Sequence, residues 1–139
     1  MPNAIYPKWK EAVLTGAPNT ALNGSGTTGV YEVLVDNYVY NPAHQFYSDL
    51  TGIVPVAEQE CLNKTYTNGV FDHDNPTWPS VPGAGAPTYE AIVYFIKNAG
   101  ANTTWRLFAI KDTGITNLPV TANGQNITHQ VNASGSIAL

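Results

Sequence analysis

Asp112-Thr113-Gly114 is the first stretch of the sequence whose residue types suggest chemistry. It follows the apolar run Leu107–Ile110 and Lys111. In dimeric aspartic proteases, a triplet of this kind after a strand supplies one carboxyl group from each subunit. The two carboxyl groups share a proton, because like charges a few ångströms apart cannot both ionise. One hypothesis for Asp112 is therefore acid proteolysis.

Two features of the neighbouring sequence favour a simple turn instead. Lys111 directly precedes Asp112 and would place a cation beside a buried carboxyl pair. The chain also lacks the apolar-apolar-Gly segment that buttresses such a site, since "GQNI" and "SGSIAL" place Gly before the apolar residues. An Asp that opens a turn and a Gly that takes positive φ explain the triplet without catalysis. We expect no enzyme and no catalytic residue, and the protease is the remote alternative.

The three histidines are candidates for general bases or metal ligands. In "GVFDHDNP", Asp72 and Asp74 share one face of an extended strand while His73 points to the other face. Two carboxylates of mixed geometry are too few for a dedicated metal site, so we expect a solvated strand end, with a weak cation or interface site as the alternative. His44 and His129 have no nucleophile or carboxylate at a recognisable catalytic spacing. The prediction is no metal and no cofactor.

We expect structural rather than chemical roles for the single cysteine and for the aromatic residues. The single Cys61 excludes an internal disulfide, and we expect it to be a small buried apolar side chain. Trp9, Trp78 and Trp105, together with eight tyrosines, are typical of a packed core or an intersubunit contact. A carbohydrate-binding platform is the alternative role for these aromatic side chains.

One helix and many short strands must position these residues. The helix is expected over residues 8–16, with Gly16 as a left-handed C-cap and with Trp9, Ala12 and Val13 on one face. Residues 43–50 are compatible with two further helical turns. Strands are expected over residues 30–40, 52–57, 61–67, 69–78, 88–97 and 105–112, and three short ones follow residue 118, with turns at Asn68-Gly69, Asn123-Gly124 and Ser134-Gly135.

The strand beginning at Val30 has the clearest alternation. Tyr31, Val33 and Val35 alternate with Glu32 and Asp36, which predicts one buried apolar face and one polar face. Short strands separated by polar turns, without β–α–β alternation, predict an antiparallel β-sandwich or barrel. We expect a single domain over residues 1–139, with residues 1–16 as an N-terminal arm.

Charge and hydropathy limit the possible partners. Six Lys and Arg against ten Asp and Glu give a net charge of −4, so direct binding of nucleic acid is not expected. There is no apolar run long enough for a membrane span and no apolar secretory signal, so we expect no membrane partner and folding in a cytoplasm. Charged residues form only 12% of the chain, which suits a surface committed to neighbouring proteins.

Four blocks of sequence, in order, resemble a family of small tailed-phage virion proteins. They are "NAIYPKWKEAVLTG", "LVDNYVYNPAHQFYSDL", "KTYTNGVFDHDNPTW" and "EAIVYFIKNAGANTTWRLFAIKDTGITNLPVTANGQNI", which together extend over nearly the full length. The family is that of capsid cement, or decoration, proteins. The blocks contain no catalytic signature, so the resemblance indicates ancestry rather than a mechanism.

The resemblance implies a jelly-roll-like β-sandwich that binds the outside of a capsid and reinforces contacts between capsomers. The implied partners are the phage major capsid protein and further copies of the chain, as a dimer or trimer. The implied location is the virion exterior after synthesis in the bacterial host cytoplasm. The alternative is a tail-associated or host-glycan-binding virion protein.

Two segments are candidates for the contact with a neighbour. One is the N-terminal arm, whose alternative role is to cover the protein's own core. The other is the Pro/Gly-rich loop 79–87, which is longer than is typical of the family. The candidate contact residues are Ile5, Tyr6, Lys8, Trp9, Lys10, Pro82 and Pro87.

Overall fold

The structure is a computed structural model that describes residues 3–132 and 135–138. Within these residues the chain forms one α-helix, four 3-10 turns and eleven strands, most of them two residues long. The helix is α1 (Pro7–Leu14), and the 3-10 turns are η1 (Gly26–Thr28), η2 (Tyr47–Asp49), η3 (Thr67–Gly69) and η4 (Asn102–Thr104). The strands are β1 (Ala4–Ile5), β2 (Val30–Val35), β3 (Gln59–Glu60), β4 (Val70–Phe71), β5 (Thr77–Trp78), β6 (Thr88–Tyr89), β7 (Ala91–Ile96), β8 (Arg106–Lys111), β9 (Val120–Thr121), β10 (Ile127–Thr128) and β11 (Ile137–Ala138).

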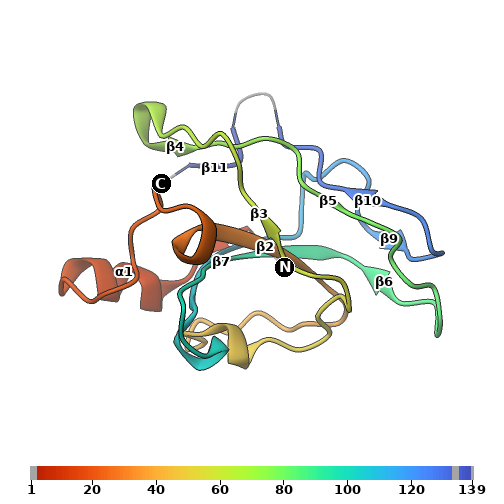
Figure 1. Ribbon diagram of the computed structural model, residues 1–139, viewed down its shortest axis with the longest axis horizontal. Coiled ribbons are helices and arrows are strands. Elements are labelled where there is room, and N and C mark those ends of the chain that lie inside the picture. Colours follow the sequence, from red (N-terminus) through yellow and green to blue (C-terminus); the bar gives the residue numbers. More distant parts are fainter. Residues whose placement is uncertain (1–2, 133–134, 139) are drawn as a thin grey trace.

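A five-stranded antiparallel sheet forms the centre of the molecule (Figure 1). Its strand order is β1-β8-β7-β2-β3, and the three long strands β2, β7 and β8 are rich in β-branched and aromatic residues. Val33 of β2 lies opposite Val93 of β7, and the register between β7 and β8 shifts after Tyr94. The sequence prediction that residues 105–112 return antiparallel to residues 88–97 is confirmed.

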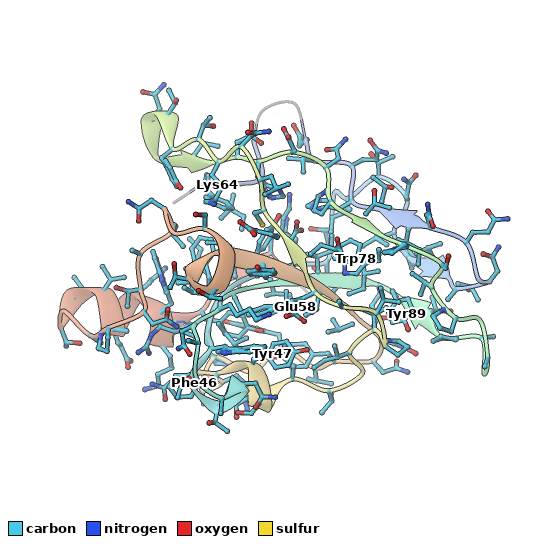
Figure 2. All side chains as sticks on the ribbon, in the orientation of Figure 1. Phe46, Tyr47, Glu58, Lys64, Trp78 and Tyr89 are labelled. Carbon is cyan, nitrogen blue, oxygen red and sulfur yellow. The ribbon has the colours of Figure 1, made fainter. Side chains whose placement is uncertain are left out.

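Both faces of this sheet are buried. On one face, Val33, Phe95 and Leu107 pack against the irregular segment 38–53, which contains η2. The opposite face lies under three two-stranded ladders, β4–β11, β5–β10 and β6–β9. Figure 2 shows Trp78 on the ladder side of the sheet and Tyr47 on the other side. The protein is therefore all-β and antiparallel, as predicted.

Helix α1 begins at Pro7 and ends with the predicted glycine cap. Gly16 has a φ of 69°, and its N–H bonds to the Val13 carbonyl at 3.2 Å. The Ala17 N–H bonds to the Ala12 carbonyl at 2.9 Å, which completes a Schellman motif. Ala12 is buried as expected, whereas Val13, predicted on the same face, is 44% exposed.

The short strands and helical turns differ more from the sequence-based prediction than the long strands do. The strands predicted over residues 52–57 and 61–67 are wrong, since the only strand there is β3, which lies between them. The two helical turns over residues 43–50 reduce to η2, whose start is fixed by Asp49 Oδ2 accepting the N–H groups of Gln45 and Phe46. The three strands after residue 118 are present, but each pairs with an earlier strand. Ser134 of the last predicted turn lies outside the described residues.

The Asn68-Gly69 turn joins two segments that meet at one β-bridge, between Thr65 and Asp72. Pairing does not continue from there, because β4 pairs with β11 instead. Among the described residues, no helix is both long enough and apolar enough to cross a membrane.

Candidate functional site

A group of polar side chains lies inside the core, between the central sheet and the ladders. Glu32 of β2 and Tyr94 of β7 are cross-strand partners in the middle of the sheet, and both are 0% exposed. His73 follows β4, His129 follows β10 and Ser136 precedes β11, so the ladders bring these three residues over the sheet. We call Glu32, His73, Tyr94, His129 and Ser136 the buried polar cluster.

Hydrogen bonds connect the members of this cluster. His129 Nδ1 donates to Glu32 Oε1 at 2.6 Å. His73 Nδ1 donates to the Asp74 carbonyl at 2.7 Å, which leaves its Nε2 to accept the Tyr94 hydroxyl at 3.0 Å. The Tyr94 oxygen in turn accepts the hydroxyl of Ser136. The cluster therefore joins the sheet to the ends of two ladders.

Burial sets the protonation of the surrounding groups. Burial lowers the pKa of His73, although the nearby Glu32 carboxylate opposes this shift. Burial and Glu32 together raise the pKa of Tyr94, and they also raise that of the Cys61 thiol, whose Sγ lies 3.6 Å from Glu32 Oε2. At neutral pH these three groups are uncharged. Three of the groups around Glu32 are thus neutral at this pH.

Three members of the cluster are potential metal ligands. One ligand atom from each of Glu32, His73 and His129 lies within 4.8 Å of the others. Nε2 of His129 is buried and has no hydrogen-bond partner among the described residues. Two imidazoles and a carboxylate form a donor set that zinc uses in proteins. The three side chains are at most 1% exposed, so the arrangement can stabilise the fold but is closed to a substrate.

Asp112, the residue that first suggested chemistry, is not part of this cluster. It follows the last residue of β8, and the side-chain oxygen of Asn3 accepts the N–H groups of Asp112 and Thr113 at 2.9 and 3.2 Å. Gly114 has a φ of 70°. The predicted turn with a positive-φ glycine is therefore confirmed.

The first half of the N-terminal arm packs inward. Tyr6 is fully buried, and its hydroxyl lies 2.8 Å from that of Tyr38. The prediction that Tyr6 contacts a neighbouring protein is thus corrected, because the side chain completes this chain's own core. Ile5 is half-buried in β1, and Trp9 is half-buried with its ring 4.8 Å from that of Phe108.

The other predicted contact residues are more accessible. Lys8 is half-buried and pairs with Glu11 at 2.9 Å, whereas Lys10 is exposed. In the loop 79–87, Pro82 is exposed and Pro87 is half-buried. The structure does not bring this loop and the arm into the buried polar cluster.

Two of the three tryptophans pack against this chain's own core. Trp78 is 0% exposed, so its ring cannot stack on a sugar in this structure. Trp105 is half-buried and stacks on Phe95 with ring centroids 5.8 Å apart. The Lys97 ammonium lies 5.0 Å from the Trp105 ring, which completes this packed group.

Sequence reasoning missed Glu32 and His129 as members of one site. It placed His73 on the face opposite Asp74, which agrees with a buried His73 and an exposed Asp74. The expectation of a solvated strand end is wrong for His73, which is 6% exposed because the ladders cover it. The available signal for Glu32 was its position inside "VYEVLV", the only charged residue of that run. A strand buried on both faces reads as a nearly continuous apolar run, so a charge within it points to a buried polar contact.

The fold and this cluster define an all-β antiparallel protein with a polar group in its core. Comparison of the chain with known protein families, with curated proteins and with solved structures found no match.

Proposed function

We propose that the protein binds the outer surface of a tailed-phage capsid and reinforces the joints between capsomers. The observation that carries this proposal is the ordered resemblance of four sequence blocks to capsid cement proteins over nearly the full length. The finer fold class belongs to the same proposal, in which the central sheet and its ladders form a jelly-roll-like sandwich. Further copies of the chain and the major capsid protein are the proposed partners.

The outward side of α1 is the contact surface that we favour. This helix lies at one end of the molecule (Figure 1), and its last turn carries Val13, 44% exposed, and Leu14, 86% exposed. Lys10 adds an exposed cation on the same short helix. Because Tyr6 and Ala12 anchor the helix to the core, these outward residues are presented on a fixed element.

A weak contact is sufficient for such a role. A protein that binds the assembled shell and not free capsomers stabilises the shell by mass action. Many copies on one lattice bind with avidity if they are joined into oligomers, so each contact can be small. A low density of charge on the surface also reduces the cost of desolvation when two proteins meet.

Co-sedimentation tests this proposal. Capsids assembled without the chain, from the major capsid protein encoded by the same genome, are mixed with the purified protein and pelleted. We expect the chain to pellet in a fixed ratio to capsomers, and Leu14→Asp to reduce the bound fraction at least about tenfold, since a buried interface charge costs more than ~1.4 kcal/mol.

Val39→Asp is the matched control, because Val39 is 76% exposed and belongs to the segment 38–53 rather than to α1. It should pellet like the unmodified chain. The absence of any co-sedimentation would refute the proposed function. Equal loss with Leu14→Asp and Val39→Asp would refute the assignment of the contact to α1.

A further inference from the structure

We propose that Glu32, His73 and His129 bind one divalent transition-metal ion, with Zn²⁺ the best match. The ion would be structural, joining the central sheet to the ladders that cover it. This inference rests on the buried polar cluster and is independent of the proposed capsid function. It departs from the sequence-based expectation of a chain without a metal.

The donor arrangement is the first argument. Glu32 comes from β2, His73 from the residues after β4 and His129 from those after β10, yet their ligand atoms lie within 4.8 Å of one another. Around a tetrahedral zinc ion with bonds of about 2.0–2.2 Å, neighbouring ligand atoms are separated by roughly 3.4 Å. Side-chain shifts of about 1 Å would therefore bring these three donors to coordination distance.

The charge of the cluster is the second argument. Glu32 is 0% exposed, and a carboxylate out of water is costly unless a cation compensates it. Around Glu32, His129 Nδ1 lies 2.6 Å from Oε1, His73 Nδ1 lies 3.8 Å from Oε2, and the Cys61 thiol donates to Oε2. A divalent cation among these groups would compensate the carboxylate more strongly than hydrogen bonds from neutral groups do.

The orientation of the histidines is the third argument. Metal binding requires an imidazole with an unprotonated nitrogen. The His73 side chain is 0% exposed and its Nδ1–H is fixed on the Asp74 carbonyl, which leaves Nε2 as the nitrogen without a proton. Outer hydrogen bonds of this kind orient ligands in protein metal sites. On His129, Nδ1 lies 2.6 Å from Glu32 Oε1, so an ion between these two side chains would replace their hydrogen bond, and the buried Nε2 has no hydrogen-bond partner among the described residues.

A hydrogen-bonded cluster without an ion is the competing explanation, and direct metal analysis distinguishes the two. The protein is unfolded in guanidinium with a chelator, refolded with ZnCl₂, desalted, and its zinc measured by atomic emission. We expect about one zinc per chain for the unmodified protein, as for a single site whose three protein ligands are buried. His129→Gln and Glu32→Gln should each lose the bound zinc.

His44→Gln is the matched control, because His44 is half-buried beside Tyr38 and lies outside the cluster. This variant should retain zinc at the level of the unmodified chain. Far-ultraviolet circular dichroism identifies the variants that fold. Zinc should also raise the melting temperature of the unmodified chain by about 10 °C at roughly a hundredfold excess over its dissociation constant.

Cobalt provides a test that needs no variant. Co²⁺ added during refolding should give the visible ligand-field absorption of a low-symmetry protein site, and Zn²⁺ should abolish it by competition. The proposal is overturned if the unmodified chain retains no zinc and shows no cobalt spectrum. It is equally overturned if folded His129→Gln and Glu32→Gln bind as much zinc as the unmodified chain. Neither result depends on whether the protein binds capsids.

Discussion

Replacing Tyr94 by Phe tests whether the buried polar cluster stabilises the fold. The ring is retained, so apolar packing in the 0% exposed position is nearly unchanged. Only the hydroxyl is lost, and with it the bonds to His73 Nε2 and Ser136 Oγ. His73 Nε2, an acceptor, and the Ser136 hydroxyl, a donor, then lose their hydrogen-bond partner inside the core.

The expected loss in the free energy of unfolding follows from these two unpaired groups. Each buried polar group that loses its partner costs about 1–3 kcal/mol, and the Ser136 hydroxyl can rotate to reduce its share. We therefore expect the free energy of unfolding to fall by about 2–4 kcal/mol. With a urea slope of about 2 kcal/mol per molar, the midpoint of unfolding should move down by roughly 1–2 M.

The assay is urea unfolding followed by tryptophan fluorescence, since Trp78 is buried in the core. Tyr66→Phe is the matched control, because the Tyr66 hydroxyl bonds to the Leu22 carbonyl at the surface and the side chain is 41% exposed. This control should change the free energy of unfolding by less than about 0.5 kcal/mol. A loss for Tyr94→Phe no larger than that of the control would refute the assignment of stability to the cluster.

Two further predictions use the same assay. Burial lowers the pKa of His73, so the unfolded chain binds this proton at higher pH than the folded chain does. The contribution of His73 to the free energy of unfolding should be fully present above about pH 6.5 and should decrease below it, by up to ~1.4 kcal/mol per pH unit. A folded His73→Asn variant whose stability depends on acid pH in the same way would contradict this prediction. Gly52 has a φ of 68°, and a Cβ there would lie 1.9 Å from the Asp36 carbonyl oxygen. Gly52→Ala should therefore lower the free energy of unfolding by about 3 kcal/mol or more. Gly85→Ala is the control: φ is 77° there but the space is open, so the loss should be about 1–2 kcal/mol. Equal losses for the two variants would refute the role of the close contact at Gly52.

Local patterns in the sequence predicted the elements that local physics determines. Gly16 as a helix cap, Gly114 as a positive-φ turn and the hairpin of β7 and β8 all depend on neighbouring residues. The partners of the two-residue strands were not predictable in this way. β4 pairs with β11 across more than sixty residues of sequence, and such short segments carry too little alternation to specify a register.

Local sequence patterns also failed to predict how the residues of the candidate site come together. Alternation correctly placed His73 on the face opposite Asp74, but it placed Glu32 on a polar face. The error arose because the strand pattern was interpreted as half-buried, while the ladders cover that face completely. The distance between Glu32 and His129 depends on how β10 packs over the sheet, which no local pattern records.

A cryo-electron microscopy map of the virus particle tests the central proposal most directly. We predict density for this chain on the capsid exterior, at the joints between capsomers, with Leu14 and the outward side of α1 facing the major capsid protein. Density for the chain on the tail, or on the capsid with α1 facing solvent, would contradict it.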